Sequence, residues 1–399
     1  MASFISRRAR AIVLGTAGLA IAGLASACSS ADGVVQVITS VGSDTTQDVS
    51  GAIAGQYNAD NASNPDPDNL QNVKAVDGTN AHTVPGDAQC GSVTYRTPPL
   101  AGQVARPNGS GAGRDALKAS VLAGDGCIDV ARSSGAPRPV GSGSGQDLAS
   151  SEYYAFGLDA VGWSSGSSHA PTNLTQAQLQ GIYNCTFTNW SQVGGTAGAI
   201  KRYWPQAGSG TRSFAQSDLL GFDPTTFSGG SCPAVTLSEE NHGDTIASAG
   251  DNETAVYVYS GAVWVAQSRG TSPDARGAQT IHQLNGKNIV RQVGTQWEPA
   301  TPNASDPGAP VAEVNVKLVT PSPAYPGVRF VFNVLDNTSP SYTPAKRFWG
   351  FTNAADGAKS PLCAGGKAST ITDFGFGTLD TTTSAAHNAA GSTCRLYTP

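Results

Sequence analysis

Apolar and polar positions along the chain follow two kinds of spacing. The run VVQVITSVG at 34–42 is almost continuously apolar, which predicts a buried strand. Val49, Ile53 and Tyr57 follow at intervals of four, which predicts an amphipathic helix that opens at a cluster of Ser, Asp and Thr. Strands that alternate with helices in this way are typical of an α/β fold.

The same alternation continues through the chain. Leu117 and Val121 predict a helix that ends at Gly124, and Leu179 and Ile182 predict another. A further helix is expected over 211–221, and further strands are expected over 128–131, 153–164, 199–204 and 255–267 and within 314–335.

Two stretches lack this periodicity. Residues 58–89 are polar and rich in Asn, Asp and Pro, which predicts an insertion on the surface. The segment GSGSGQD at 141–147 has the composition of a linker. No internal repeat accompanies these segments.

The first 27 residues have the composition of an export signal. Three arginines among the first ten residues precede the apolar stretch 11–27, which is too short and too weakly hydrophobic for a membrane span. The motif LASAC then ends in Cys28, so we expect lipidation of Cys28 and a polar tether over 28–33. The alternative is an ordinary signal peptide cut after Ala27, which would leave Cys28 as a free thiol.

The acidic balance of the chain disfavours nucleic acid as a partner. Asp and Glu outnumber Lys and Arg by 29 to 24, for a formal net charge of -5, and removal of the signal segment takes away three more arginines. The remaining basic residues are scattered and form no patch. Nothing beyond the signal segment is predicted to cross a membrane.

Seven cysteines are present, and six remain if Cys28 carries lipid. An even number of cysteines in an exported chain indicates disulfides. A zinc site is the alternative, but neither C-x-x-C nor H-x-x-x-H spacing occurs. Of the pairings that six cysteines allow, we favour neighbours in sequence: Cys90–Cys127, Cys185–Cys232 and Cys363–Cys394.

Three turns rich in glycine and hydroxyl side chains precede predicted helices, at 42–45, 109–111 and 208–211. Such a turn presents unpaired backbone N–H groups at the positive end of a helix dipole, and glycine lets a ligand approach the backbone closely. The alternative is that each Ser or Thr only caps its helix. Three such turns in one chain favour an anion site, with the candidates Ser43, Asp44, Thr45, Ser110, Ser209, Gly210 and Thr211.

Enzyme motifs are missing or out of context. The Walker sequence G-x-x-x-x-G-K-[ST] does not occur. The pattern G-x-S-x-G occurs at 162–166, but Pro171 and turn formers follow where a nucleophile elbow needs a helix. The five histidines are scattered. We therefore expect no enzyme activity, no cofactor and no metal site, and a hydrolase is the least favoured alternative.

Five motifs in a fixed order carry a family resemblance: GSDTTQ, NGSGAG, IDVARSS, LTQAQLQGIYNCTFTNW and PQAGSGTRSF. Through them the chain resembles the PstS-like phosphate-binding proteins of ABC importers, in the type II periplasmic-binding-protein superfamily. The resemblance covers most of 34–267 and, more loosely, 329–377. It implies an α/β fold with two lobes, joined by crossing strands, and a ligand cleft between the lobes.

The resemblance also implies an order of domains. After the signal peptide (1–27) and the lipidated tether (28–33), we expect the first part of lobe I over 34–152 and lobe II over 153–262. The rest, 263–399, is expected to return to lobe I and to add a C-terminal extension.

Proteins of this family hold a dehydrated oxyanion with backbone N–H groups and Ser or Thr hydroxyls from both lobes. Carried over by position, all three turns would contribute donors. The residues that the resemblance assigns to the ligand are Ser43, Asp44 and Thr45 in the first turn, Ser110 in the second, and Ser209, Gly210 and Thr211 in the third.

Two positions depart from the family pattern. The arginine that some members carry four residues before the G-S-G-T serine is here Pro205, so Arg212 becomes the candidate clamp for the anion, with Arg202 behind it. The family aspartate that accepts the proton of hydrogen phosphate is here Ser134. Because serine also donates, we expect weaker discrimination against sulfate unless Asp44 supplies the acceptor.

Together these inferences predict a lipid-anchored solute-binding subunit of an ABC importer, most simply for inorganic phosphate, on the extracytoplasmic face of the cell membrane. It would act as a monomer that captures the anion, closes its lobes and delivers the anion to a membrane permease. The alternatives are a binding protein for another oxyanion or small acidic solute, and a ligand-free structural or adhesive secreted protein.

Overall fold

The computed structural model covers one compact unit that begins at Val34. The expected signal peptide, Cys28 and the tether lie outside the described part of the chain, as does most of the expected strand region before Tyr325. The residues that the structure describes are 36–62, 68–293, 295–299, 325–351, 360–379 and 392–399.

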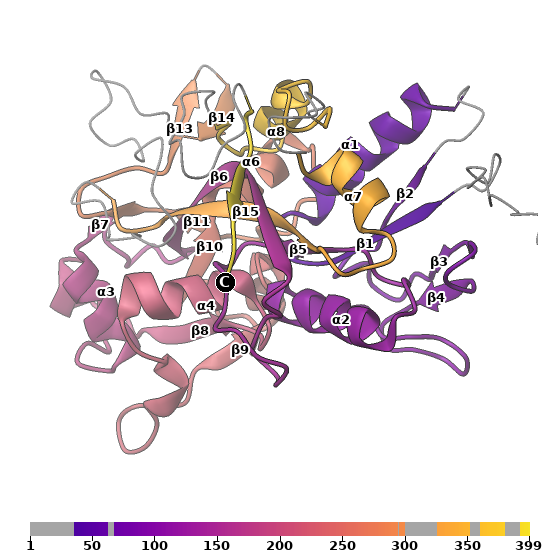
Figure 1. Cartoon of the computed structure of the whole chain (residues 1–399). Helices are drawn as coiled ribbons and strands as arrows, with labels where there is room; N and C mark the ends of the chain where they lie inside the picture. The colour runs from indigo at the N-terminus through magenta and orange to yellow at the C-terminus, as the bar shows by residue number, and fades with distance from the viewer. Residues whose placement is uncertain (1–35, 63–67, 294, 300–324, 352–359, 380–391) are drawn as a thin grey trace, which may run out of the picture. The chain divides into compact units, whose positions relative to one another are not determined.

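Two long antiparallel strands connect the two lobes of the fold: β6 (Ser151–Ser165) and β15 (Val328–Asp336). Figure 1 shows them crossing the centre of the chain. The first half of β6 packs in the cores of lobe I, while its second half, with Val161 and Trp163, packs in the core of lobe II. The predicted strand at 153–164 is therefore confirmed and serves both lobes.

Lobe I is formed by the segments before β6 and by those after β15. Its strands β2, β1 and β5 continue the sheet on one side of β15, and helices lie beside them (Figure 1). The elements of lobe I are β1 (Val37–Gly42), α1 (Gln47–Asp60), β2 (Asn69–Asn72), β3 (His82–Val84), β4 (Val93–Tyr95), α2 (Ser110–Ala123), β5 (Val130–Ser133), α7 (Tyr342–Trp349), α8 (Ala368–Asp373) and β16 (Arg395–Tyr397).

Lobe II lies on the other side of β6, where the sheet continues through β10, β8 and β9. Its elements are β7 (Asn173–Leu174), α3 (Gln176–Tyr183), β8 (Lys201–Pro205), α4 (Gly210–Phe214), β9 (Thr236–Ser238), α5 (Gly243–Ser248), β10 (Ala255–Ser260), α6 (Gly261–Arg269), β11 (Thr280–Ile281), β12 (Gln283–Leu284), β13 (Val290–Val293) and β14 (Gln296–Pro299).

The parallel pairs of the sheet confirm the α/β fold. β1 pairs in parallel with β2 and β5, and β8 pairs in parallel with β9 and β10, whereas β15 is antiparallel to both of its neighbours. A mixed sheet of this kind needs helical crossovers between its parallel strands, and α1, α2 and α5 provide them. The expected domain boundaries at 152 and 262 stay predictions, although Trp264, Leu284 and Val290, which follow residue 262, pack in the core of lobe II.

Helix ends follow the local signals in the sequence. α2 ends before Gly124, which adopts the left-handed conformation with φ 65°. α3 begins with a capping box in which the Thr175 hydroxyl accepts from the Gln178 N–H. α4 continues as one π-helical turn over Ala215–Leu220 and stops at Gly221, in agreement with the helix expected over 211–221.

Two expectations about local structure are wrong. The run 255–267 is not a single strand, because Ser260 caps a helix by accepting from the Val263 N–H, so the strand β10 ends there and α6 begins. The polar stretch 58–89 is not only a surface insertion, since it supplies β2, which pairs with β1 and buries Leu70. Neighbours in three dimensions outweighed local composition at both places.

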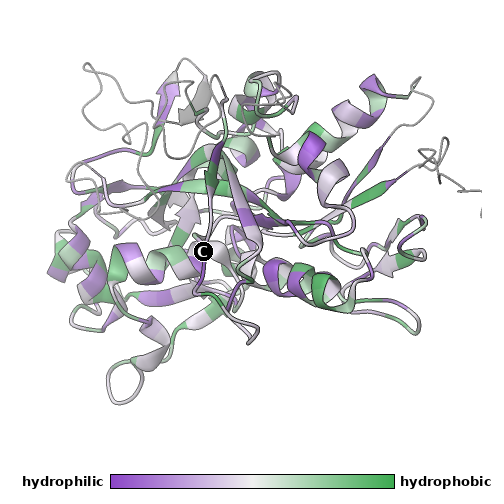
Figure 2. Cartoon of the chain, in the orientation of Figure 1, coloured by the Kyte–Doolittle hydropathy of each residue, from purple (hydrophilic) through white to green (hydrophobic). Residues whose placement is uncertain are grey.

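Apolar side chains gather around the crossing strands. Figure 2 shows hydrophobic residues on the inner strands and a mixture of both kinds of residue along α1 and α2, as expected for amphipathic helices. Lobe II has one large core that includes Trp163, Trp190 and Trp204, and lobe I has two smaller ones. These cores hold the turns that face the cleft on rigid elements.

All three favoured disulfides are confirmed: Cys90–Cys127, Cys185–Cys232 and Cys363–Cys394. The first and third belong to lobe I and the second belongs to lobe II, so no disulfide in the described part links one lobe to the other. Among the described residues, no helix combines the length and the apolar character that crossing a bilayer requires.

Candidate functional site

The three predicted turns meet where the two lobes touch. The turn 43–46 precedes α1, Gly109 precedes α2, and Ser209 precedes α4. The Gly111 N–H donates to the Gly208 carbonyl across the lobes at 2.9 Å. A Cβ atom on Gly109 would lie 2.4 Å from the Gly208 oxygen, so this contact requires glycine.

The hydroxyls of Ser43, Ser110 and Ser134 form a buried group that we call the hydroxyl cluster. The Ser134 Oγ lies 3.3 Å from both Ser43 Oγ and Ser110 Oγ, and the Ser134 N–H donates to Ser110 Oγ at 2.9 Å. A Cβ on Gly210 would come within 2.3 Å of both Ser110 Oγ and Ser134 Oγ, so lobe II approaches the cluster through bare backbone. The sequence therefore predicted the meeting of four residues from separate loops.

Thr45 and Thr211 meet beside the hydroxyl cluster. Their Oγ1 atoms lie 3.3 Å apart, one from each lobe, and both side chains are buried. Donors from the first and third turns thus converge, as expected for one shared site.

Arg329 on β15 lies where the side chains of Thr45, Thr211 and the backbone of Ser134 meet. No sequence pattern had indicated Arg329 as a site residue. Its guanidinium donates to Thr211 Oγ1 at 2.8 Å, to Thr45 Oγ1 at 3.3 Å and to the Ser134 carbonyl at 3.1 Å. It also pairs with the buried Asp159 carboxylate, where Nη2–H and Nε–H both donate to Oδ2, at 2.7 and 3.0 Å. The available signal was a single charged residue within the apolar strand VRFVF.

Glu240 is a second residue of the site that no sequence pattern had indicated. It follows β9, its side chain is fully buried, and its Oε1 accepts from Thr45 Oγ1 at 2.8 Å and from the Thr211 N–H at 3.1 Å. No motif marks it, because it reaches the cleft from a loop with no periodic pattern.

The Asp44 carboxylate points away from the hydroxyl cluster toward Asn241. Its Oδ1 accepts from the Asn241 amide at 2.9 Å, and Asn241 in turn accepts from the Ser260 N–H at 2.9 Å. Burial raises the pKa of Asp44 well above the usual range, the Glu240 carboxylate raises it further, and the bond from Asn241 works against both. Asp44 therefore bridges the lobes but does not supply an acceptor within the cluster.

Ser209 and Arg212 behave as helix residues. Ser209 Oγ accepts from the Arg212 N–H at 2.9 Å, so Ser209 caps α4, as the alternative interpretation held. The Arg212 guanidinium donates to the Pro205 carbonyl at 3.3 Å and lies 3.8 Å from Asp223, outside the cluster. Arg202 is buried among carbonyls of lobe II. The structure thus brings Arg329, not Arg212, to the predicted donors.

Comparison with protein families agrees with this architecture. The family described as "PBP superfamily domain" matches residues 88–339, which is more than half of the chain. The chain belongs to this family. A search of curated proteins finds no match.

A search of solved structures also found similar proteins. An ABC-type phosphate transport receptor from Vibrio cholerae is 18% identical, with 85% of this chain and 99% of that chain covered and a TM-score of 0.45. A phosphate-binding protein from Stenotrophomonas maltophilia is 15% identical, with 86% and 90% covered and a TM-score of 0.41.

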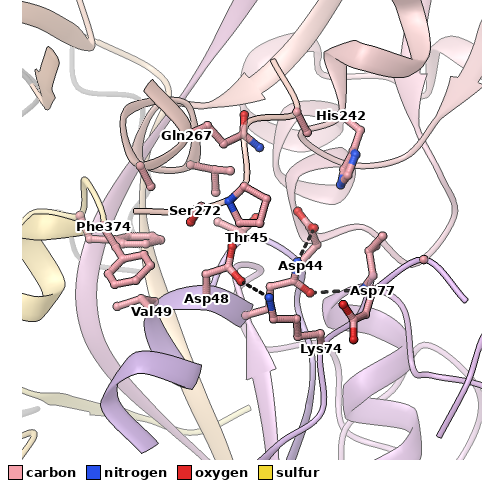
Figure 3. Close-up of a pocket in the computed structure, with 18 of the residues that line it drawn as sticks. Asp44, Thr45, Asp48, Val49, Lys74, Asp77, His242, Gln267, Ser272 and Phe374 are labelled. Atoms are coloured by element: carbon pink, nitrogen blue, oxygen red, sulfur yellow. Dashed lines mark hydrogen bonds and ion pairs between the residues drawn. The ribbon is translucent and has the colours of Figure 1, made fainter. Parts of the chain in front are cut away.

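A cavity of about 290 Å³ adjoins the site of this PBP-superfamily domain and shares Asp44 and Thr45 with it. Figure 3 shows its lining, with Asp44 and Thr45 from lobe I and His242 from lobe II. The Lys74 ammonium pairs with the Asp48 carboxylate at its edge, at 3.0 Å. Residues of both lobes line the cavity, among them Asp44, His242 and Gln267.

The serine of the G-x-S-x-G motif, Ser164, does not lie on the strand-to-helix turn that a nucleophile elbow requires. Ser164 lies within β6 and its hydroxyl donates to the Tyr257 carbonyl at 3.2 Å. Among the described residues, no group of three or more His, Cys, Asp or Glu side chains could hold a metal ion.

Proposed function

We propose that this protein is the solute-binding subunit of an ABC importer and that it captures inorganic phosphate between its lobes. Membership of the PBP superfamily supports the binding role, and the similar proteins from Vibrio cholerae and Stenotrophomonas maltophilia are described as a phosphate transport receptor and a phosphate-binding protein. No step of bond chemistry and no cofactor is part of the proposal.

The main support for the proposal is that the hydroxyl cluster and Arg329 lie next to each other where the two lobes meet. Ser43, Ser110 and Ser134 offer three rotatable donors, with Ser134 Oγ 3.3 Å from each of the other two, and Arg329 brings a cation next to them. Oxyanions are bound by such sets of hydroxyl, amide and guanidinium donors in sites that exclude water. Arg329 takes the clamping role that the sequence suggested for Arg212.

Ligand capture by lobe closure follows from the contacts between the lobes. Thr45, Asp44 and Gly111 of lobe I each bond to lobe II, and Asn108 donates to Glu239 at 2.9 Å. An anion between the lobes would add its own bonds to both and stabilise the closed form. The binding residues proposed are Ser43, Asp44, Thr45, Ser110, Ser134, Ser209, Gly210, Thr211 and Arg329, with Asp44 and Ser209 acting through their backbones.

We further propose the cellular setting that the N-terminal sequence predicts. Residues 1–27 would direct export, Cys28 would carry the lipid, and 28–33 would hold the domain at the outer face of the membrane. A monomer there could present both lobes to a membrane permease.

Titration calorimetry and small-angle scattering on the purified protein, stripped of bound anion by unfolding and refolding, would test the proposal. We expect binding of phosphate with a decrease in radius of gyration. Ser43→Ala combined with Ser134→Ala should weaken binding at least about a hundredfold, since each lost bond to a charged ligand contributes about 1.5–3 kcal/mol. Ser217→Ala on the exposed face of lobe II is the control. Absence of heat and closure with phosphate would contradict the proposal and favour the ligand-free structural alternative.

A further inference from the structure

The cavity beside the anion site has an apolar wall to which both lobes contribute. On the lobe I side Val49 and Phe376 are buried and Phe374 is half-buried (Figure 3). Val263 and Ala266 of α6 line it from lobe II. Sites for small molecules are typically concave and mostly apolar, with a few polar groups that orient the ligand. At about 290 Å³ the cavity has room for a ligand built around one ring.

The polar part of the lining carries negative charge. The carboxylates of Asp44, Asp48 and Asp77 line the cavity. The Lys74 ammonium lies 3.0 Å from the Asp48 carboxylate. The Arg106 guanidinium lies 3.3 Å from the Asp77 carboxylate. Asp44 is therefore the carboxylate whose charge a ligand can match.

The Asp44 side chain is bonded to neutral groups. Its carboxylate accepts from the Asn241 amide at 2.9 Å and, more weakly, from the Gln47 amide at 3.4 Å. Asp44 is only 5% exposed, and burial raises the pKa of its carboxyl. A cation bound in the cavity would favour the ionised carboxylate and offset part of the cost of burying it.

Ser272, which follows α6, is a second and independent sign of a ligand. It is only 6% exposed and lines the cavity (Figure 3). Its N–H donates to the Ala266 carbonyl at 3.3 Å, whereas its hydroxyl has no hydrogen-bond partner among the described residues. Because buried hydroxyls are normally bonded, Ser272 Oγ is open to a polar group within the cavity.

We propose that this cavity is a second ligand site of the protein, for a small organic ammonium ion that carries one ring or an apolar group of similar size. The ammonium group donates to the Asp44 carboxylate and to Ser272 Oγ, and the apolar group packs against Phe374. An ammonium group has three donors and no acceptor, which suits a site whose open polar atoms can accept. The carboxylates of the lining disfavour an anion of the same size.

A ligand in this cavity would connect the two lobes. Asp44 lies in the lobe I turn that also carries Ser43 and Thr45, whereas Ser272 belongs to lobe II. A ligand bonded to both lobes stabilises the same closed form as an anion in the neighbouring site, so each ligand should raise the affinity for the other. This consequence rests on the proposed function, whereas the ammonium site itself does not.

Three probes separate the charge of the ligand from its apolar group: benzylammonium, benzyl alcohol, which lacks the charge, and methylammonium, which lacks the ring. Calorimetric titration of the purified protein at about 0.15 M salt keeps non-specific ion pairing screened. We expect saturable binding of one benzylammonium per chain, and at least about tenfold weaker binding of each of the other two. Absence of saturable benzylammonium binding, or an equal affinity for either of the other probes, would overturn the inference.

Two substitutions test whether benzylammonium occupies this cavity. Asp44→Asn can still accept from Asn241 but removes the charge, so benzylammonium should bind at least about tenfold more weakly while benzyl alcohol is unaffected. Ser272→Ala should weaken benzylammonium about threefold to tenfold. Ser268→Ala is the matched control, since its hydroxyl bonds the Val265 carbonyl at 2.7 Å and it does not line the cavity. Unchanged benzylammonium affinity in both cavity variants would contradict the assignment.

Repeating the benzylammonium titration with saturating phosphate distinguishes the possible failures. If phosphate binds, benzylammonium should bind at least about fivefold more tightly in its presence. An unchanged affinity would mean that benzylammonium does not bind between the lobes, which overturns this inference and leaves the proposed function standing. If phosphate does not bind but the three probes rank as expected, the proposed function fails and the ammonium site stands. If a cavity variant does not fold, the three probes on the unaltered protein decide.

Discussion

The hydroxyl cluster and the carboxylate side of the same cleft, Glu240 with Asp44, are built in opposite ways. The cluster comes from turns that precede helices or follow strands of lobe I, and each turn carries its own local signal. The carboxylates depend on long-range partners, since Glu240 bonds Thr45 and Asp44 bonds Asn241, each across the lobes. Donors for an anion can therefore be placed by local sequence, whereas the buried carboxylates beside them are placed by tertiary structure.

Arg329 links the two sides, and its loss is expected to have the largest effect. Arg329→Leu removes the donor to Thr211 and leaves the buried Asp159 charge without its cation. Breaking a buried pair in this way costs about 3–5 kcal/mol, so we expect a fall of that size in the free energy of unfolding and loss of measurable anion binding. Denaturant unfolding and calorimetry would measure the two effects.

The double variant Arg329→Leu with Asp159→Asn serves as the control for that experiment. The amide can still accept from Ser260 Oγ and the Ala262 N–H, as Asp159 does. We expect it to recover part of the lost stability without recovering binding. A double variant no more stable than the single one would show that the unpaired charge of Asp159 is not the cause.

Asp129 tests whether the pH dependence of folding stability is separate from the pH dependence of anion binding at the site. Burial raises the pKa of this lobe I carboxyl to about 7, although bonds from Ser341 and from the Thr39 N–H oppose the shift. The unfolded carboxyl ionises near pH 3.9, so the folded state is the one that holds the proton between about pH 4 and about pH 7. Stability should be greatest below that range, fall by up to about 4 kcal/mol across it, and stay level above it.

Asp129→Asn should flatten this profile in denaturant unfolding between about pH 4 and pH 8. Its sulfate affinity should keep the pH dependence of the unaltered protein, since Asp129 bonds residues of lobe I only. If the variant instead changes the pH dependence of sulfate binding, Asp129 is coupled to the site and the two dependences are not separate.

The substitution Gly210→Ala tests the hydroxyl cluster, which supplies donors to the site. An alanine Cβ there would meet Ser110 Oγ and Ser134 Oγ at 2.3 Å, so these hydroxyls or the α4 backbone must move. Overpacking of this kind costs about 1–3 kcal/mol, and we expect both phosphate and sulfate to bind at least tenfold more weakly. Gly55→Ala in α1 is the control, since its Cβ would meet nothing within 4 Å. Unchanged affinity in Gly210→Ala would mean that the anion does not use the cluster.

Much of the fold and the donor side of the site followed from the sequence. Helices with regular apolar spacing, such as the one with Leu117 and Val121, and the three disulfides were predicted correctly. Turn chemistry also located Ser43 and Ser110, because caps and glycines act over a few residues.

What the sequence did not predict depends on distant contacts. The strand assignment of 255–267 failed because one cap at Ser260 outweighs a β-branched composition. Arg329 and Glu240 were missed because their roles arise from neighbours more than a hundred residues away, Thr45 among them. A charge in a buried strand signals a function but does not name its partner.

Ser134→Ala is expected to have the smallest effect on anion affinity. It tests whether the hydroxyl cluster distinguishes phosphate from sulfate. The substitution removes one hydroxyl that lies 3.3 Å from Ser43 Oγ and Ser110 Oγ, so phosphate and sulfate should each bind about tenfold more weakly. Their ratio should not change, because a rotatable hydroxyl can donate to either anion. Calorimetry with both anions measures that ratio. A changed ratio would assign the discrimination between phosphate and sulfate to Ser134.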